Sequence, residues 1–279
     1  MGPRVPLYIA AGIQFFNALL ITFVTPESNI KVLTTPRAQR QQEFNWKASN
    51  PVGGFMRLFG NAHILRVAAC AYFFAMLSRA SLDAQFFNYA NIRFGWSQAQ
   101  SGPIMLFVGL MLAVVPRLVV PKLGVRKSIL AGLLVNSAGL VGTGLAPTAA
   151  SFLGGIAVVA FGSVYSPALQ ALLANLAPPG DRGALLGAVG SLVELTGAIG
   201  STMYASILGK ATAAKSATSS TTTASTASLL RLLPRRLPPG MHFVVGGGIS
   251  FLAWTVAVRG FKDNKALNDN HINFAELDQ

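Results

Sequence analysis

Long apolar runs alternate with shorter polar segments along the chain. Seven runs stand out, at residues 7–24, 64–91, 102–120, 128–146, 150–176, 183–208 and 241–258. A helix needs about 20 mostly apolar residues to cross about 30 Å of hydrocarbon, and the runs have roughly that length. Strands of a membrane barrel would be about half as long, and a lipid-embedded backbone must satisfy its own hydrogen bonds. The pattern therefore predicts an all-α membrane protein with seven transmembrane helices.

The polar segments give the expected organisation of the chain. Its expected parts are a first transmembrane helix (1–24), a basic cytoplasmic loop (25–63), a five-helix part of a bundle (64–210), a Ser/Thr-rich disordered loop (211–240), a last transmembrane helix (241–260) and a polar cytoplasmic tail (261–279). The Ser/Thr tract buries too little apolar area to offset its chain entropy. The first run is longer than the apolar region of a signal peptide, about 7–15 residues, so we expect a retained span.

Composition and charge agree with a membrane location. Of the residues, 52% are hydrophobic and only 11% are charged, against about 25% charged in soluble domains. The 22 Lys and Arg outnumber the 9 Asp and Glu, which raises nucleic-acid binding as an alternative. However, most basic residues flank the apolar runs, so we expect the partner to be the lipid bilayer and not nucleic acid. Fourteen of them fall on the side of the 25–63 loop and seven on the other, which predicts an outer or lumenal N-terminus and a cytoplasmic C-terminus.

Several classes of chemistry lack the residues that they need. Cys70 is the single cysteine, and the three histidines are scattered, so we expect no disulfide framework, metal site or cofactor. The three glycines at 246–248 lack a preceding strand and a following Lys-Ser/Thr, which argues against a phosphate loop. We expect no catalytic residues and no enzyme activity.

Charged residues within the runs are the first candidates for function, because each costs about 2.5–3.5 kcal/mol to insert. Arg79 and Asp83 are four residues apart and would share one helix face. Two interpretations stay open. The two residues form an ion pair that only lowers the cost of burial, or they line a polar cavity with Gln85 and Asn88 that binds a charged solute.

Glu194 lies near the middle of the sixth run. Desolvation would favour the neutral, protonated form of its carboxyl group, which suits a reversible proton carrier. A packing hydrogen bond to a neighbouring helix is the alternative. Further polar positions within the runs are candidates either for a cavity wall or for interhelical hydrogen bonds: Gln14, Asn17, Asn136, Tyr165, Gln170 and Tyr204.

Glycines are frequent in the last four runs. Small residues allow close backbone approach between membrane helices, so we expect glycines to mark helix contacts. In the sixth run these are Gly183, Gly187, Gly190, Gly197 and Gly200.

The short segment between the third and fourth runs contains Lys122, Gly124, Arg126 and Lys127. We expect Gly124 to supply an unusual φ for the reversal and the cations to anchor the cytoplasmic interface. A gating role for this loop is the alternative.

Three segments resemble motifs of the major facilitator superfamily. Residues 123–127 (LGVRK) resemble the second, weaker copy of its loop signature, although Pro121 stands where the fuller signature has an acidic residue, which weakens the case for charge-relay gating. Residues 178–183 (PPGDRG), with Gly187, resemble the turn before the eleventh helix, and residues 25–28 (TPES) resemble the end of the sixth. The resemblance covers about residues 7–260 and is to the tetracycline-efflux and hippocampus-abundant-transcript branch.

This resemblance implies that the seven runs correspond to helices six through twelve of a fold with two six-helix bundles around a midplane solute site. It also implies a truncated or half transporter of a small organic solute, with protons as a candidate coupling ion and a membrane partner that supplies the missing helices. A non-transporting scaffold or regulatory partner of a full-length transporter is the alternative. A seven-span receptor is a third, less favoured one.

Overall fold

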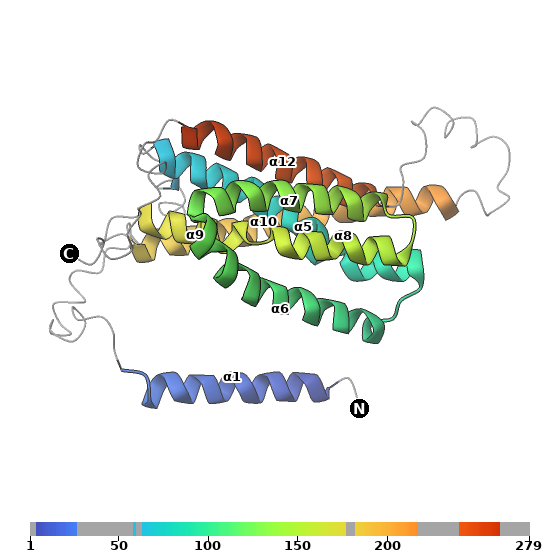
Figure 1. The fold of residues 1–279 in the computed structure, drawn as a ribbon. Helices are drawn as coiled ribbons and strands as arrows, with labels where there is room; N and C mark the ends of the chain where they lie inside the picture. The colour runs from blue at the N-terminus through green and yellow to red at the C-terminus, as the bar shows by residue number, and fades with distance from the viewer. Residues whose placement is uncertain (1–3, 27–57, 60–62, 177–181, 217–239, 263–279) are drawn as a thin grey trace. The chain divides into compact units, whose positions relative to one another are not determined.

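The structure, a computed structural model, describes residues 4–26, 58–59, 63–176, 182–216 and 240–262 (Figure 1). Every regular element in these ranges is an α-helix: α1 (Val5–Phe23), α5 (His63–Phe94), α6 (Gln98–Leu123), α7 (Val125–Leu145), α8 (Ala149–Gly162), α9 (Tyr165–Leu176), α10 (Arg182–Ser216) and α12 (Met241–Lys262). The all-α class expected from the sequence is confirmed.

Six helical segments are long and apolar enough to cross a membrane, with α8 and α9 together forming one of them. The apolar stretch of α1, Leu7–Phe23, is shorter than the other six. Residues 1–49 and 50–279 form two separate compact units, so α1 is described by itself. Its side chains are largely exposed, and those of Gln14 and Asn17 are among them.

Helices α6 and α10 are among those that extend beyond the ends expected from the apolar runs. The side chain of Ser97 accepts a hydrogen bond from the backbone N–H of Gln100, whose side chain accepts one from the N–H of Ser97, so α6 begins at Gln98 instead of 102. Helix α10 continues to Ser216, which corrects the expectation that residues 211–216 are disordered. Three alanines among these six residues favour continuation of the helix.

The fifth apolar run forms one candidate membrane span, as expected, but its helix is interrupted within the span. Helix α8 ends at Gly162, and α9 begins at Tyr165. Pro167 has no N–H to donate to the carbonyl of Ser163 four residues earlier, and that carbonyl instead accepts a hydrogen bond of 3.1 Å from the N–H of Ser166. The break thus follows from one proline.

Close packing on α7 depends on glycine. A Cβ atom at Gly139 would lie 2.7 Å from the backbone nitrogen of Val159 on α8, and one at Gly144 would lie 2.6 Å from the carbonyl oxygen of Gly240, just before α12. On α10, only part of the expectation holds. A Cβ at Gly200 would meet Ala80 on α5, but nothing lies within 4 Å of a Cβ at Gly183, Gly187, Gly190 or Gly197. These four glycines face open space, so the prediction that they mark helix contacts within this bundle is wrong.

Several expected features lie outside the described residues. They are most of the 25–63 loop, the turn at 178–180, the remainder of the Ser/Thr tract to 239 and the tail from 263.

Candidate functional site

A cavity of about 510 Å³ lies among α5, α9 and α10. Its lining residues are Tyr72, Met76, Arg79, Ala80, Asp83 and Ala84 from α5, Ser166 and Gln170 from α9, and Val193, Thr196 and Gly197 from α10. The α5 residues fall at 72, 76, 79–80 and 83–84, a helical repeat that places them on one side of that helix. The cavity therefore has a mixed wall, with apolar surface around a few convergent polar groups, as small-molecule sites have.

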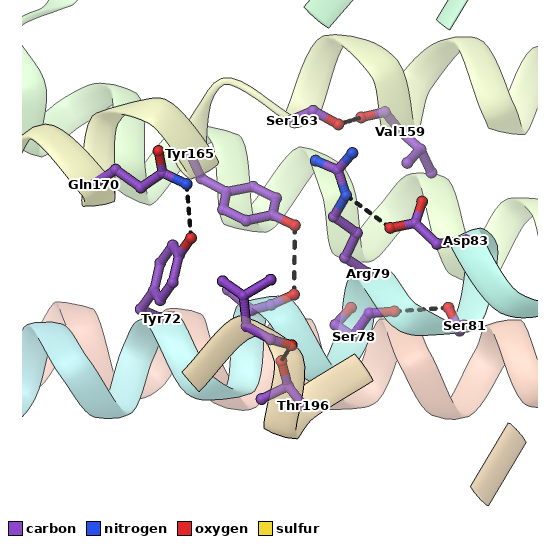
Figure 2. A network of polar contacts seen from close by, with 12 residues as sticks. Tyr72, Ser78, Arg79, Ser81, Asp83, Val159, Ser163, Tyr165, Gln170 and Thr196 are labelled. Carbon is purple, nitrogen blue, oxygen red and sulfur yellow. Dashed lines mark hydrogen bonds and ion pairs between the residues drawn. The ribbon is translucent and has the colours of Figure 1, made fainter. Parts of the chain in front are cut away.

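Arg79 and Asp83 provide the charges of this cavity. The Nε of Arg79 donates to Oδ2 of Asp83 at 3.0 Å, and the two side chains are 33% and 59% exposed (Figure 2). The remaining guanidinium N–H groups and the other carboxylate oxygen make no hydrogen bond with the described residues. The pair can therefore exchange partners with a bound molecule.

Gln170 and Tyr72 form another part of the cavity wall and join α9 to α5. The side-chain amide of Gln170 donates to the hydroxyl of Tyr72 at 2.7 Å. The hydroxyl of Tyr165, five residues earlier on α9, instead donates to the carbonyl of Ala75 at 3.4 Å (Figure 2). The Tyr165 side chain is buried and is not among the residues that line the cavity. Tyr204 is also fully buried outside it, and its hydroxyl has no partner among the described residues.

A second, narrow space of about 20 Å³ adjoins the same ion pair on the side of α6, α7 and α8. Asn136 and Ser163 line it. The amide of Asn136 donates to the hydroxyl of Ser250 at 3.0 Å, and that hydroxyl donates to the carbonyl of Leu133. Asn136 thus joins α7 to α12, the interhelical role that was the alternative for it.

Three other candidates lie apart from the 510 Å³ cavity. Gln85 is buried and accepts a hydrogen bond from Asn88, and Asn88 lines a different cavity near the end of α5. Gln85 and Asn88 are therefore not among the residues that line the 510 Å³ cavity with Arg79 and Asp83. Glu194 is exposed on α10, lines no cavity described here and makes no hydrogen bond with the described residues.

The loop between α6 and α7 is a single residue, Gly124. Its φ of 77° and ψ of 161° are accessible essentially only to glycine, as the expected reversal requires. Lys122 and Lys127 are exposed, and Arg126 is half-buried. Their anchoring or gating role stays a prediction.

Sequence reasoning missed Tyr72, Ser166 and Thr196 as cavity residues. The clearest signal was positional, because Tyr72 precedes Arg79 by two helical turns and Ser166 precedes Gln170 by one. The sequence could not reveal that these two faces meet.

Comparison with known proteins agrees with the all-α membrane fold described above. A sequence model of the Major Facilitator Superfamily matches residues 1–201. The fold is similar to the crystal structure of the human organic anion transporter MFSD10 (TETRAN), with a TM-score of 0.58 and 17% sequence identity. That similarity covers 77% of this chain and 48% of the transporter, so the chain spans about half of the transporter's length. Since the family match covers well over half of the chain, this multi-pass membrane protein belongs to the major facilitator superfamily, a family of transporters and not of enzymes.

Proposed function

We propose that the chain contributes to secondary active transport of a small organic solute, which binds in the cavity among α5, α9 and α10. The observation that carries this proposal is the Arg79–Asp83 pair, a charged group inside a membrane span that faces a 510 Å³ cavity. Charged residues within spans face cavities or other protein and mark solute pathways.

The solute that fits best carries a negative charge. Arg79, which lines the cavity, uses one N–H on Asp83 and has further N–H donors without a partner among the described residues, while Tyr72 and Ser166 add hydroxyl groups to the wall. The neighbouring fold is that of an organic anion transporter, which agrees with this substrate class. An anionic group would compete with Asp83 for Arg79.

A proton is the coupling ion that this competition favours. Protonation of the Asp83 carboxylate would give a neutral acid and release Arg79 to bind the solute, and deprotonation would restore the ion pair. Glu194 is the second candidate proton carrier, although it lies outside the cavity. We further propose an outer or lumenal N-terminus and a cytoplasmic C-terminus, from the distribution of Lys and Arg.

Transport in proteoliposomes tests the proposal. The 279-residue chain is reconstituted, and uptake of fluorescein, an organic anion, is measured with and without a pH gradient and compared with uptake of the cation rhodamine 123. We expect saturable fluorescein uptake that Arg79→Gln abolishes. Fluorescein uptake that Arg79→Gln leaves unchanged would contradict the assignment of the site.

The same reconstituted protein tests two other interpretations. One is a non-transporting scaffold, and the other is a half transporter whose partner supplies further helices. A scaffold should show no uptake of either probe, yet co-purify from native membranes with a transporter. If co-reconstitution with that partner creates uptake that depends on Arg79, the half-transporter interpretation is supported.

A further inference from the structure

A separate cavity, of about 330 Å³, lies at the turn from α5 to α6. It is lined by Phe87, Asn88, Asn91, Ile92, Trp96, Gln98 and Ser101. It shares no residue with the 510 Å³ cavity, and no lining side chain is ionisable at neutral pH. Its volume lies in the range of small-molecule pockets, about 300–1,000 Å³.

The turn that forms this cavity is fixed at both ends. Gly95 has a left-handed φ of 70°, and its N–H donates to the carbonyl of Asn91, while the N–H of Trp96 donates to the carbonyl of Ala90. The side-chain amide of Asn91 also donates to the carbonyl of Trp96 at 3.1 Å. With the capping box that begins α6, these bonds hold the cavity walls in place without a ligand.

Trp96 gives the cavity an aromatic wall of fixed orientation. Its ring centroid lies 5.2 Å from that of Phe94 and 6.1 Å from that of Phe152 on α8. These contacts attach the indole to the aromatic core at this end of the bundle.

Neutral hydrogen-bonding groups in the wall are left unused. Ser101 is 1% exposed, and its hydroxyl makes no hydrogen bond with the described residues. The amide of Gln98 makes none either, and Asn88 and Asn91 each donate only one bond and accept none on the side-chain oxygen. Among the described residues, the Ser101 oxygen is not one of the fully buried side-chain atoms that lack a partner, so it is open to the cavity and can pair with a ligand there.

We propose that this cavity is a binding site for an uncharged, hydroxyl-rich small molecule such as a sugar. The amide and hydroxyl groups match a ligand that both donates and accepts hydrogen bonds, and the indole face matches its C–H surface. A charged ligand would lose hydration without gaining a countercharge in this wall. The site is separate from the cavity assigned to transport, so the proposal does not depend on the transported solute.

Fluorescence of Trp96 tests the proposal directly. The full chain is prepared with Trp46→Phe and Trp254→Phe, so that Trp96 is its only tryptophan. It is titrated with maltose and, separately, with the anion glucuronate and the cation spermidine. We expect a saturable change of Trp96 emission with maltose and none with the charged probes. No saturable change with maltose, or an equal change with a charged probe, would overturn the proposal.

Two variants locate the bound probe. Ser101→Ala removes the hydroxyl of the buried Ser101, and Gln98→Ala removes an exposed amide that makes no hydrogen bond with the described residues. Each should weaken maltose binding by about fivefold, since a lost hydrogen bond costs about 1 kcal/mol. Ser206→Ala, on the exposed surface of α10, is the matched control and should leave binding unchanged. If Ser101→Ala fails to fold, Gln98→Ala alone decides, and unaltered maltose binding by that variant places maltose elsewhere.

Discussion

The side-chain amide of Gln170 on α9 lies 2.7 Å from the hydroxyl of Tyr72 on α5 and holds one wall of the 510 Å³ cavity. Tyr72→Phe removes this bond and a donor that faces the solute. We expect the KM for fluorescein uptake to rise about tenfold and the unfolding free energy to fall by about 0.5–1.5 kcal/mol.

Tyr165→Phe is the matched control for this change. It also removes a hydroxyl bonded between α9 and α5, but at a position outside the cavity. Its KM should equal that of the unaltered protein, and an equal rise in both variants would mean that the effect is structural.

Asp83→Asn should separate proton coupling from solute binding. The amide cannot exchange a proton, so uptake driven by a pH gradient should disappear while exchange of internal for external fluorescein continues. Flux measurements in proteoliposomes with and without a gradient check this.

Glu194→Gln gives the contrasting result, because Glu194 is exposed and lines no cavity described here. Gradient-driven uptake should persist at the level of the unaltered protein. The reverse pattern, with coupling lost at Glu194 and kept at Asp83, would transfer the proton site to α10.

Gly124→Ala should destabilise the protein by about 1–3 kcal/mol, because the φ of 77° and ψ of 161° strain any residue with a Cβ. Gly142→Ala is the comparison, since it lies within α7 with nothing within 4 Å of an added Cβ. It should be neutral or stabilise by up to about 1 kcal/mol. Thermal unfolding in detergent measures both, and an equal loss at the two positions would contradict the role of Gly124.

Gly139→Leu should disrupt the bundle, because a Cβ there already meets the backbone nitrogen of Val159 at 2.7 Å. We expect a loss of more than about 3 kcal/mol or failure to fold. Gly187 faces open space on α10, so Gly187→Leu should leave the melting temperature of the isolated chain within about 2 °C of that of the unaltered protein. A large drop for Gly187→Leu would show a contact that the described bundle does not contain.

Apolar run length was sufficient to predict the helices, because a membrane requires long, internally bonded segments whatever their side chains. Their ends were less accessible. The start of α6 depends on Ser97 and Gln100, a capping box that a closer comparison of polar positions would have found. The break after α8 depends on Pro167, which was visible within the run but compatible with a kink as well as a break.

The cavity was only partly predictable. Arg79 and Asp83 could be paired from their spacing along one helix, and the structure shows that pair. Their other partners come from α9 and α10, more than 80 residues away, and no local pattern specifies which faces of separate helices meet. The glycines of α10 show the same limit. A Cβ at Gly200 would contact another helix and one at Gly183, Gly187, Gly190 or Gly197 would not, yet the sequence does not distinguish these positions.

The break between α8 and α9 has a consequence for how the chain enters the membrane. The two helices have 14 and 12 residues, and each is shorter than the roughly 20 that hydrocarbon requires. Neither can be inserted as an independent unit during synthesis, so the pair must partition together. The junction of the two helices packs closely against α7, where a Cβ in place of a hydrogen of Gly132 would lie 2.8 Å from both the carbonyl oxygen of Gly162 and the backbone nitrogen of Tyr165. This span should therefore reach its final depth only after α7 is in place.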